Sequence, residues 1–183
     1  MPLTPPDLNI LKLATKRVIL EPISTAHARE LSELFADQNL HTFVPFRPPT
    51  FEEQRTRCER WANRISPSGD EVWLNWAARY RQSGKIIGHF QSGYKDPQTA
   101  SIGYVVAKAF QGQGLAFEAL TEIFKLLRDT LAISEVRAWT DTRNVASHRL
   151  ATKLGMTQIE FIKDADFFKG ATSDEYVFSL KLK

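Results

Sequence analysis

Three predicted β-strands in the middle of the chain restrict the fold more than any other feature. From Val72 to Tyr80 apolar residues recur at every second position, which is the period of a half-buried strand. The turn signals Ser83-Gly84 and Asp96-Pro97 then separate two further strands of the same kind. Consecutive strands with such short connections indicate an antiparallel meander. We expect its strands at Val72–Tyr80, Lys85–Tyr94 and Ala100–Val106.

The other elements follow from helical spacing and capping patterns. Leu31, Leu34 and Phe35 lie at helical spacing, and Thr50 and Glu53 form a capping box before a second helix. Strands and helices are therefore mixed, as α+β in the first half and as β-α-β-α-β in the second. The stripes predicted to be buried are Cys58, Trp61 and Ile65 on the second helix, and Phe117, Leu120, Phe124, Leu127 and Leu131 on the long helix. The expected strands outside the meander are Arg17–Glu21, Val136–Thr140, Gln158–Ile162 and Glu175–Leu182, with a short helix at Val145–Leu154.

Length and composition predict one domain. A chain of 183 residues that is 43% hydrophobic suits a single domain at 16–183, with residues 1–15 as an N-terminal tail or arm. The lone Cys58 excludes an internal disulfide framework, and with four His it offers little material for a metal site. Neither a bilayer-spanning segment nor a secretory signal is apparent, so we expect a cytoplasmic protein that does not bind membranes.

The charge pattern is also informative. The net charge of +3 is spread along the chain without a block of Lys and Arg, which argues against nucleic acid as a partner. It leaves room for a local anion site.

The glycine-rich turn at Gln111–Ala116 is the strongest candidate for that site. It lies between the last meander strand and the long helix, where free N–H groups and the helix dipole favour a phosphate. A P-loop is excluded because Leu115 and Ala116 stand where Lys and Ser or Thr are required. A dinucleotide fingerprint is excluded because Phe117 stands at the third glycine position.

The remaining pattern, Gln111-x-x-Gly114-x-Ala116, resembles the acetyl-CoA loop of the GCN5-related N-acetyltransferase (GNAT) superfamily, which reads Gln/Arg-x-x-Gly-x-Gly/Ala. Farther along the chain, Asn144 and Ser147 are similar to that superfamily's second cofactor helix. The order of strand, loop, long helix, strand and Asn-Ser helix also matches. A packed strand-turn-helix without a ligand is the structural alternative, but it does not explain why these residues occur together.

Three features are similar to the ribosomal-protein N-acetyltransferase (RimJ/RimL-like) branch in particular. They are Ser147 at its spacing, Ile102-Gly103-Tyr104 before the loop, and the opening segment Arg17–Leu20. The resemblance covers roughly residues 16 to 182.

The resemblance implies a fold and a donor site. The fold would be an α+β three-layer sandwich, with helices on both faces of a mixed, mostly antiparallel sheet of about six to seven strands. A V-shaped opening between the strand ending at Val106 and the strand at Val136–Thr140 would hold acetyl-CoA as co-substrate, with no metal. Asn144 would serve the pantetheine arm, or simply cap its helix, and Lys153 would meet a phosphate or solvent. The implied donor-binding residues are Val105, Val106, Gln111, Gly112, Gln113, Gly114, Leu115, Ala116, Asn144, Ser147 and Lys153.

Catalysis requires an acid for the leaving thiolate, a base for the acceptor ammonium and donors for the oxyanion. Backbone N–H groups near Val105 and Val106 would supply the oxyanion donors. Many superfamily members place the acid, a Tyr, where this chain has Ala151. Ser147 is the substitute that the branch suggests, with helix packing as the alternative.

The base is less clearly indicated. The branch often has Glu at the position of Ser101. His89 on the middle meander strand would serve directly or through water, with a purely structural role as the alternative. Weaker candidates are Glu71, His41 and Tyr104.

The resemblance thus implies an acetyl-CoA-dependent N-acetyltransferase that acts on a primary amine by direct attack in a ternary complex. The acceptor would be a protein N-terminus or a small molecule, and the enzyme a monomer or homodimer. The loop Phe43–Phe51, with its aromatics and Arg47, would form the acceptor wall. One alternative is a non-catalytic acyl-CoA-binding module of the same fold, and a second is a nucleotide-binding protein.

Overall fold

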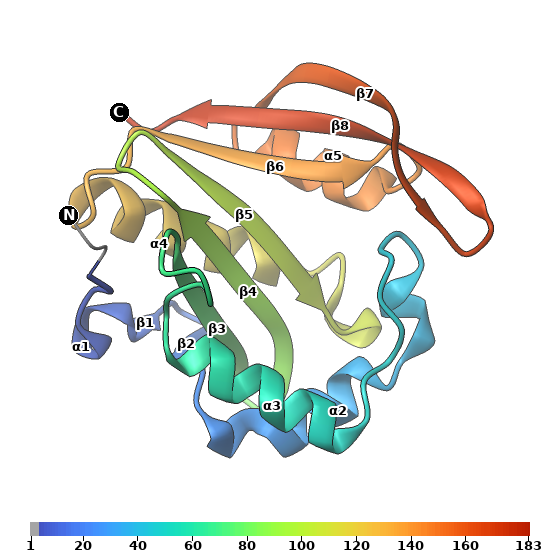
Figure 1. Ribbon diagram of the computed structural model, residues 1–183. Coiled ribbons are helices and arrows are strands. Elements are labelled where there is room, and N and C mark those ends of the chain that lie inside the picture. Colours follow the sequence, from blue (N-terminus) through green and yellow to red (C-terminus); the bar gives the residue numbers. More distant parts are fainter. Residues whose placement is uncertain (1–3) are drawn as a thin grey trace.

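An eight-stranded β-sheet in the order β1-β2-β3-β4-β5-β6-β8-β7 forms the centre of the protein (Figure 1). The computed structural model describes residues 4–183. Neighbouring strands are antiparallel except β5 and β6, which are parallel. The strands are β1 (Leu13–Ala14), β2 (Val18–Pro22), β3 (Val72–Tyr80), β4 (Ile86–Tyr94), β5 (Thr99–Val106), β6 (Glu135–Asp141), β7 (Thr157–Phe168) and β8 (Ala171–Lys181).

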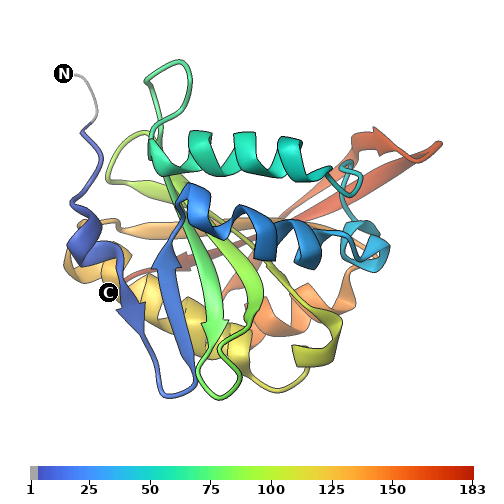
Figure 2. The ribbon, with the colours of Figure 1, turned by 90° about the horizontal axis from the view of Figure 1, so that it is seen from below.

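Helices cover both faces of the sheet, which gives the three layers expected of an α+β sandwich (Figure 2). On one face α2 (Ala28–Phe35) and α3 (Phe51–Ala62) pack in a cluster around Leu31. On the other face the larger core contains Leu120 and Leu127 of α4 (Leu115–Asp129) and Ala151 of α5 (Val145–Lys153). The remaining helices are α1 (Leu8–Leu11) and the 3-10 turns η1 (Thr25–His27), η2 (Gln38–His41) and η3 (Lys108–Phe110).

The N-terminal arm takes part in this core. β1 pairs with β2 at the edge of the sheet, and Leu11 is 2% exposed. The indole Nε1 of Trp76 donates to the Leu11 carbonyl at 2.7 Å. Residues 8–14 therefore cover the outer end of the meander and satisfy a buried indole N–H, which otherwise lacks an acceptor.

The sheet opens between β5 and β6. Their parallel pairing includes only Thr99–Ser101 with Glu135–Arg137, although β5 continues to Val106 and β6 to Asp141. Each strand keeps its other neighbour over this stretch, β4 for β5 and β8 for β6. The strands consequently diverge beyond Ser101, and the expected V-shaped opening is present (Figure 1).

The capping box at Thr50 and Glu53 is confirmed, because each side chain bonds the other residue's backbone N–H. Cys58 is fully buried, as expected of a core thiol. Two of the predicted buried helix stripes were wrong in their last residue. Ile65 lies beyond the end of α3, and Leu131 lies beyond the end of α4.

The last two strands are longer than predicted, and the sheet has eight strands instead of six or seven. β7 and β8 form a hairpin that turns at Lys169 and Gly170, whose φ values are +53° and +80°. Positive φ at both turn residues suits a tight hairpin. Residues 163–168 do not alternate in polarity because β7 is exposed on both faces, and its register shifts between Ile162 and Asp166. Periodicity therefore did not reveal this part of the strand.

Candidate active site

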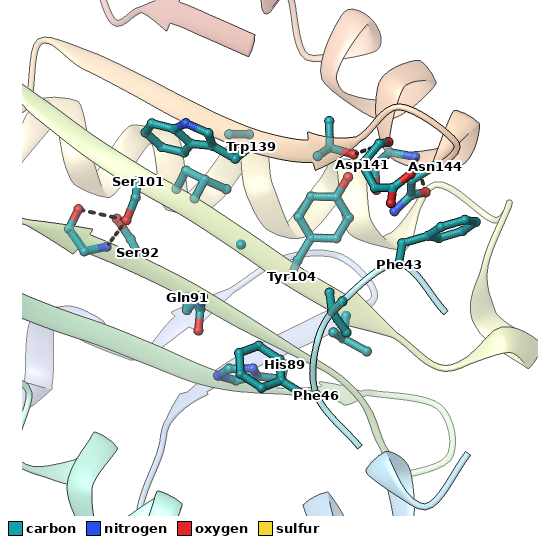
Figure 3. A pocket seen from close by; sticks show the side chains of 18 of the residues that line it. Phe43, Phe46, His89, Gln91, Ser92, Ser101, Tyr104, Trp139, Asp141 and Asn144 are labelled. Atoms are coloured by element: carbon teal, nitrogen blue, oxygen red, sulfur yellow. Dashed lines mark hydrogen bonds between the residues drawn. The ribbon is translucent and has the colours of Figure 1, made fainter. Parts of the chain in front are cut away.

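A cavity of about 730 Å³ occupies the opening between β5 and β6. Tyr104 of β5 and Trp139 of β6 contribute to its two sides, and Asn144 lies at the start of α5 (Figure 3). His89 and Gln91 of β4 line it farther down. The cavity therefore reaches from the α5 side of the sheet to the side covered by α2 and α3.

The glycine turn has the backbone that a helix N-terminal anion site needs. Gly112 and Gly114 have φ values of +73° and +78°, a conformation that residues with a Cβ rarely adopt. Gly114 is the N-cap of α4 and provides no side-chain cap. The first intrahelical bond there is from Glu118 N–H to Gly114 O, at 3.1 Å, so the preceding N–H groups of the helix are available.

Two charged residues hold this turn in place. Arg17 donates from Nη1 to the Gln113 carbonyl at 3.0 Å and from Nε to the Glu118 carboxylate at 2.8 Å. Glu118 also accepts from the Arg17 backbone N–H at 2.7 Å. Arg17 was predicted only as the start of a strand and as part of the resemblance, because a contact between this residue, just before β2, and α4 leaves no local signal.

Val105 and Val106 of β5 face different partners. Ala107 N–H donates to the Ile87 carbonyl of β4 at 2.8 Å. Polar groups of alternate residues point to opposite edges of a strand, so those of Val105 turn toward β4 and those of Val106 toward the opening. The Val106 carbonyl accepts from Gln111 Nε2 at 2.8 Å, which fastens the glycine turn to the strand end.

Asn144 caps α5 with the oxygen of its side-chain amide. Its Oδ1 accepts from the Ser147 N–H at 3.2 Å. Within residues 4–183 no hydrogen bond engages its Nδ2. The amide therefore has a donor available on the cavity side while it also stabilises the helix.

Tyr104 and Ser147 are neighbours in the cavity. The pKa of the Tyr104 phenol is raised, chiefly because burial disfavours the phenolate, and the nearby Ser147 hydroxyl offsets part of that increase. Both residues line the cavity. Sequence reasoning listed Tyr104 only as a weak candidate base, but a phenol with a raised pKa retains its proton and suits the role of a proton donor.

His89 lines the cavity but is engaged on its floor. Its Nε2 lies 3.0 Å from Asn75 Oδ1, and its ring stacks on Trp61 with centroids 4.5 Å apart. Burial lowers the pKa of His89 to about 3, with a further contribution from the charge of Arg57. These contacts fit the structural alternative for His89.

His41 is also used structurally. It is buried, and its Nε2 lies 2.8 Å from the Phe35 carbonyl.

Lys153 lies outside the main cavity. Its Nζ is 4.9 Å from the centre of the Phe117 ring, at a second cavity of about 330 Å³ that Lys125 and Arg128 also line. The position is consistent with either alternative for Lys153, a ligand phosphate or solvent.

The loop after η2 contributes part of the acceptor wall. Phe43 and Phe46 line the cavity. Arg47 instead forms a bidentate ion pair with Glu53, and Phe51 lies under the guanidinium of Arg29. The expected contribution of Arg47 and Phe51 to this wall is therefore absent.

The cavity is more acidic than the sequence suggested. Its lining includes the carboxylates of Glu71, Asp141, Asp166 and Glu175. Three of them come from the ends of β6, β7 and β8, so only the folded sheet gathers them. Burial and the charges of Asp166 and Asp141 raise the pKa of Glu175.

Residues 4–183 contain neither a metal-binding cluster nor a membrane-spanning helix. No three or more His, Cys, Asp or Glu side chains are placed to hold a metal ion. No helix in that part of the chain has the length and apolar character required to cross a membrane.

Comparison with known proteins places this geometry in a family. The profile of the "Acetyltransferase (GNAT) domain" matches residues 17–157. A ribosomal protein uS5-alanine N-acetyltransferase of Escherichia coli is 24% identical over 93% of this chain and 90% of its own length. An FsC-acetyl coenzyme A-N(2)-transacetylase of Aspergillus fumigatus is 25% identical over 81% of this chain and 66% of its own length.

A solved structure supports the fold. The ribosomal L7/L12 alpha-N-protein acetyltransferase RimL, in complex with coenzyme A, superposes with a TM-score of 0.82 over 93% of this chain and 97% of its own. The sequences are 18% identical in this comparison.

Proposed function

Because the chain belongs to the GNAT acetyltransferase family, we propose that it transfers the acetyl group of acetyl-CoA to a primary amine by direct attack in a ternary complex. One observation carries the proposal. The open edge of β5 leads to the glycine turn at the N-terminus of α4, and Tyr104 and Ser147 line the cavity in the same opening.

The donor would lie in this opening. The free N–H groups at the start of α4 suit its pyrophosphate, and the turn residues Gln111–Ala116 surround that place. The outward polar groups of Val106 suit the pantetheine arm, and so does the Asn144 Nδ2. Lys153 at the end of α5 would serve a phosphate.

The chemistry follows from the same residues. A neutral amine attacks the thioester carbonyl, and a backbone N–H on the open edge of β5 stabilises the developing oxyanion. As the carbon–sulfur bond breaks, the thiolate takes the proton of the Ser147 hydroxyl, beside Tyr104, and the Ser147 oxygen regains a proton from the amine nitrogen as that nitrogen becomes an amide. We do not assign the base to His89, because its imidazole is stacked and hydrogen-bonded within the floor.

The acceptor would approach from the side covered by α2 and α3. The cavity lining includes Phe43, Phe46, Glu71 and Glu175, which suit a cationic amine with an apolar neighbour, although Arg57 and Arg60 also line it. A protein N-terminus fits this description, as does a small amine. The names of the uS5-alanine and L7/L12 relatives favour the protein N-terminus as the first acceptor to test.

The test measures thiol release from acetyl-CoA with peptides that begin with Ala or Ser and with a panel of polyamines and amino acids. Mass spectrometry identifies the product, and calorimetry measures the affinity for CoA. The same peptides with a blocked N-terminus are the control. Transfer to a free amine supports the proposal, while preferential binding of ATP or NAD over CoA contradicts it.

The absence of the expected Tyr at Ala151 and Glu at Ser101 favours a second candidate, a non-catalytic acyl-CoA-binding module of the same fold. Tight CoA binding without transfer to any peptide or amine supports that candidate instead.

A further inference from the structure

Two glycines make room for polar side chains on the floor of the cavity. A Cβ at Gly93 of β4 would lie 2.4 Å from Oε1 of Glu71, and a Cβ at Gly103 of β5 would lie 2.8 Å from Nε2 of Gln91. Real Cβ atoms do not approach other atoms so closely. The carboxylate and the amide therefore lie flat across β4 and β5, where any larger residue would displace them.

This floor is on the acceptor side of the sheet. His89, Gln91 and Gly93 alternate along β4 and share one face, and the stacking of Trp61 on His89 identifies it as the face covered by α3. Figure 3 shows His89, Gln91 and Ser101 following one another along this side of the cavity. The donor turn starts at α4, on the opposite face.

Glu71 lies at the closed end of the opening. Gly93, over which its carboxylate lies, pairs with Ser101, and Ser101 is the last residue of β5 that pairs with β6. A group at this point is next to the place where the two strands diverge. Glu71 therefore lies between the α3 side of the cavity and the opening between β5 and β6.

In the described part of the chain the Glu71 carboxylate has no partner. Among residues 4–183 neither a hydrogen bond nor an ion pair engages either of its oxygens. By contrast, Asp141 is paired with Arg143 and bonded by Ser173, and these contacts lower its pKa to about 2. Glu175 lies at the far arm of the opening, where β8 pairs with Asp141 of β6.

We propose that Glu71 is the catalytic base, an inference that rests on the proposed function. The carboxylate accepts one proton from the acceptor ammonium, directly or through one water, and becomes a carboxylic acid. The neutral amine then forms the carbon–nitrogen bond as the carbon–sulfur bond breaks. Ser147 gives its hydroxyl proton to the thiolate and regains one from the amine nitrogen as that nitrogen becomes an amide. Gln91 accepts an N–H of the incoming amine at its amide oxygen and so positions the amine.

The first test is Glu71→Gln, compared with Glu33→Gln at an exposed position of α2 as a matched control. We expect kcat with a transferred peptide or amine to fall about 100-fold in Glu71→Gln, within the range for loss of a general base. The KM for acetyl-CoA stays within about twofold, and Glu33→Gln behaves as wild type. The kcat/KM of Glu71→Gln for the acceptor should also depend more steeply on pH than that of the wild type, because the acceptor amine must then bind already deprotonated.

Two further variants test the position of the carboxylate. The Ser101 Oγ lies 3.1 Å from the same Cβ position over Gly93, so Ser101→Glu brings a carboxylate into the space of Glu71. We expect the double variant Glu71→Gln/Ser101→Glu to have a kcat at least tenfold above that of Glu71→Gln. Gly93→Ala retains Glu71 but displaces it, and kcat should fall at least fivefold with normal CoA affinity.

The outcomes are separable from failure of the proposed function. If the wild-type protein transfers acetyl groups and Glu71→Gln keeps kcat within threefold, or if Ser101→Glu gives no recovery, the role of Glu71 is refuted and the enzyme activity stands. If the wild-type protein transfers to no amine, the proposed function itself fails.

Discussion

The Tyr104 phenol of β5 and the Ser147 hydroxyl of α5 are neighbours in the wall of the cavity. They come from the strand that would support the donor and from the helix that Asn144 caps. Burial raises the pKa of Tyr104, so the pair remains protonated at neutral pH and can deliver a proton to a leaving group.

We therefore expect Ser147→Ala and Tyr104→Phe each to lower kcat by about 10- to 100-fold, because each removes a hydroxyl from one proton-donating unit. The double variant should be only slightly slower than the slower single variant. Tyr94→Phe, outside the cavity lining, is the control. Single-turnover rates measure the effect, and fully additive losses would show that the two hydroxyls act separately.

A bulky residue at Gly114 should weaken donor binding. Gly114→Val forces a β-branched residue to φ near +78° at the start of α4 and places it at the expected pyrophosphate. We expect the Kd for acetyl-CoA to rise at least tenfold, or about 1.4 kcal/mol. Calorimetry with CoA measures this change.

Gly84→Val is the matched control for Gly114→Val. Gly84 also has positive φ, at +69°, but lies in the β3–β4 turn with no atom near its Cβ position. The Gly84→Val variant should lose a similar free energy of unfolding and keep its CoA affinity. Unchanged CoA affinity in folded Gly114→Val would contradict the location of the site.

Asn144 allows helix capping to be separated from ligand binding. Asn144→Asp keeps an N-cap oxygen for the Ser147 N–H but removes the Nδ2 donor, whereas Asn144→Ala removes both. We expect both to bind CoA several-fold more weakly. Only the Ala variant should also lose about 1 kcal/mol of unfolding free energy. Normal CoA affinity in the Asp variant would limit Asn144 to capping.

His89 should affect the pH dependence of stability. Its pKa falls from an ordinary 6.5 to about 3 on folding, so the unfolded chain binds more protons between these values. The free energy of unfolding should therefore decrease on acidification below about pH 6.5, by up to about 1.4 kcal/mol per pH unit from this residue. Urea unfolding between pH 7.5 and 5 measures the slope. His89→Gln should lose this part of it, and identical slopes would mean that His89 is not buried as a neutral ring.

The local elements were largely predictable from the sequence. The meander, the long helix and the capping box each depend on residues close together in the chain, whose spacing carries the signal. The exposed end of β7 was not predictable in this way, because neither face of that strand is selected to be apolar.

The backbone of the proposed donor site was also predictable, because its pattern from Gln111 to Ala116 is a continuous strand–turn–helix. The sequence by itself determined this turn, the Asn144–Ser147 helix start and the family that they indicate.

Only the tertiary structure decided the chemistry of the acceptor side. Glu71 is placed over Gly93 and Ser101 by the pairing of β4 with β5, and Tyr104 and Ser147 line one cavity in the opening between β5 and β6. His89 is removed from solvent by Trp61, which lies on a helix of a different layer. These relationships join residues from separate elements, so the spacing of residues along the chain does not encode them.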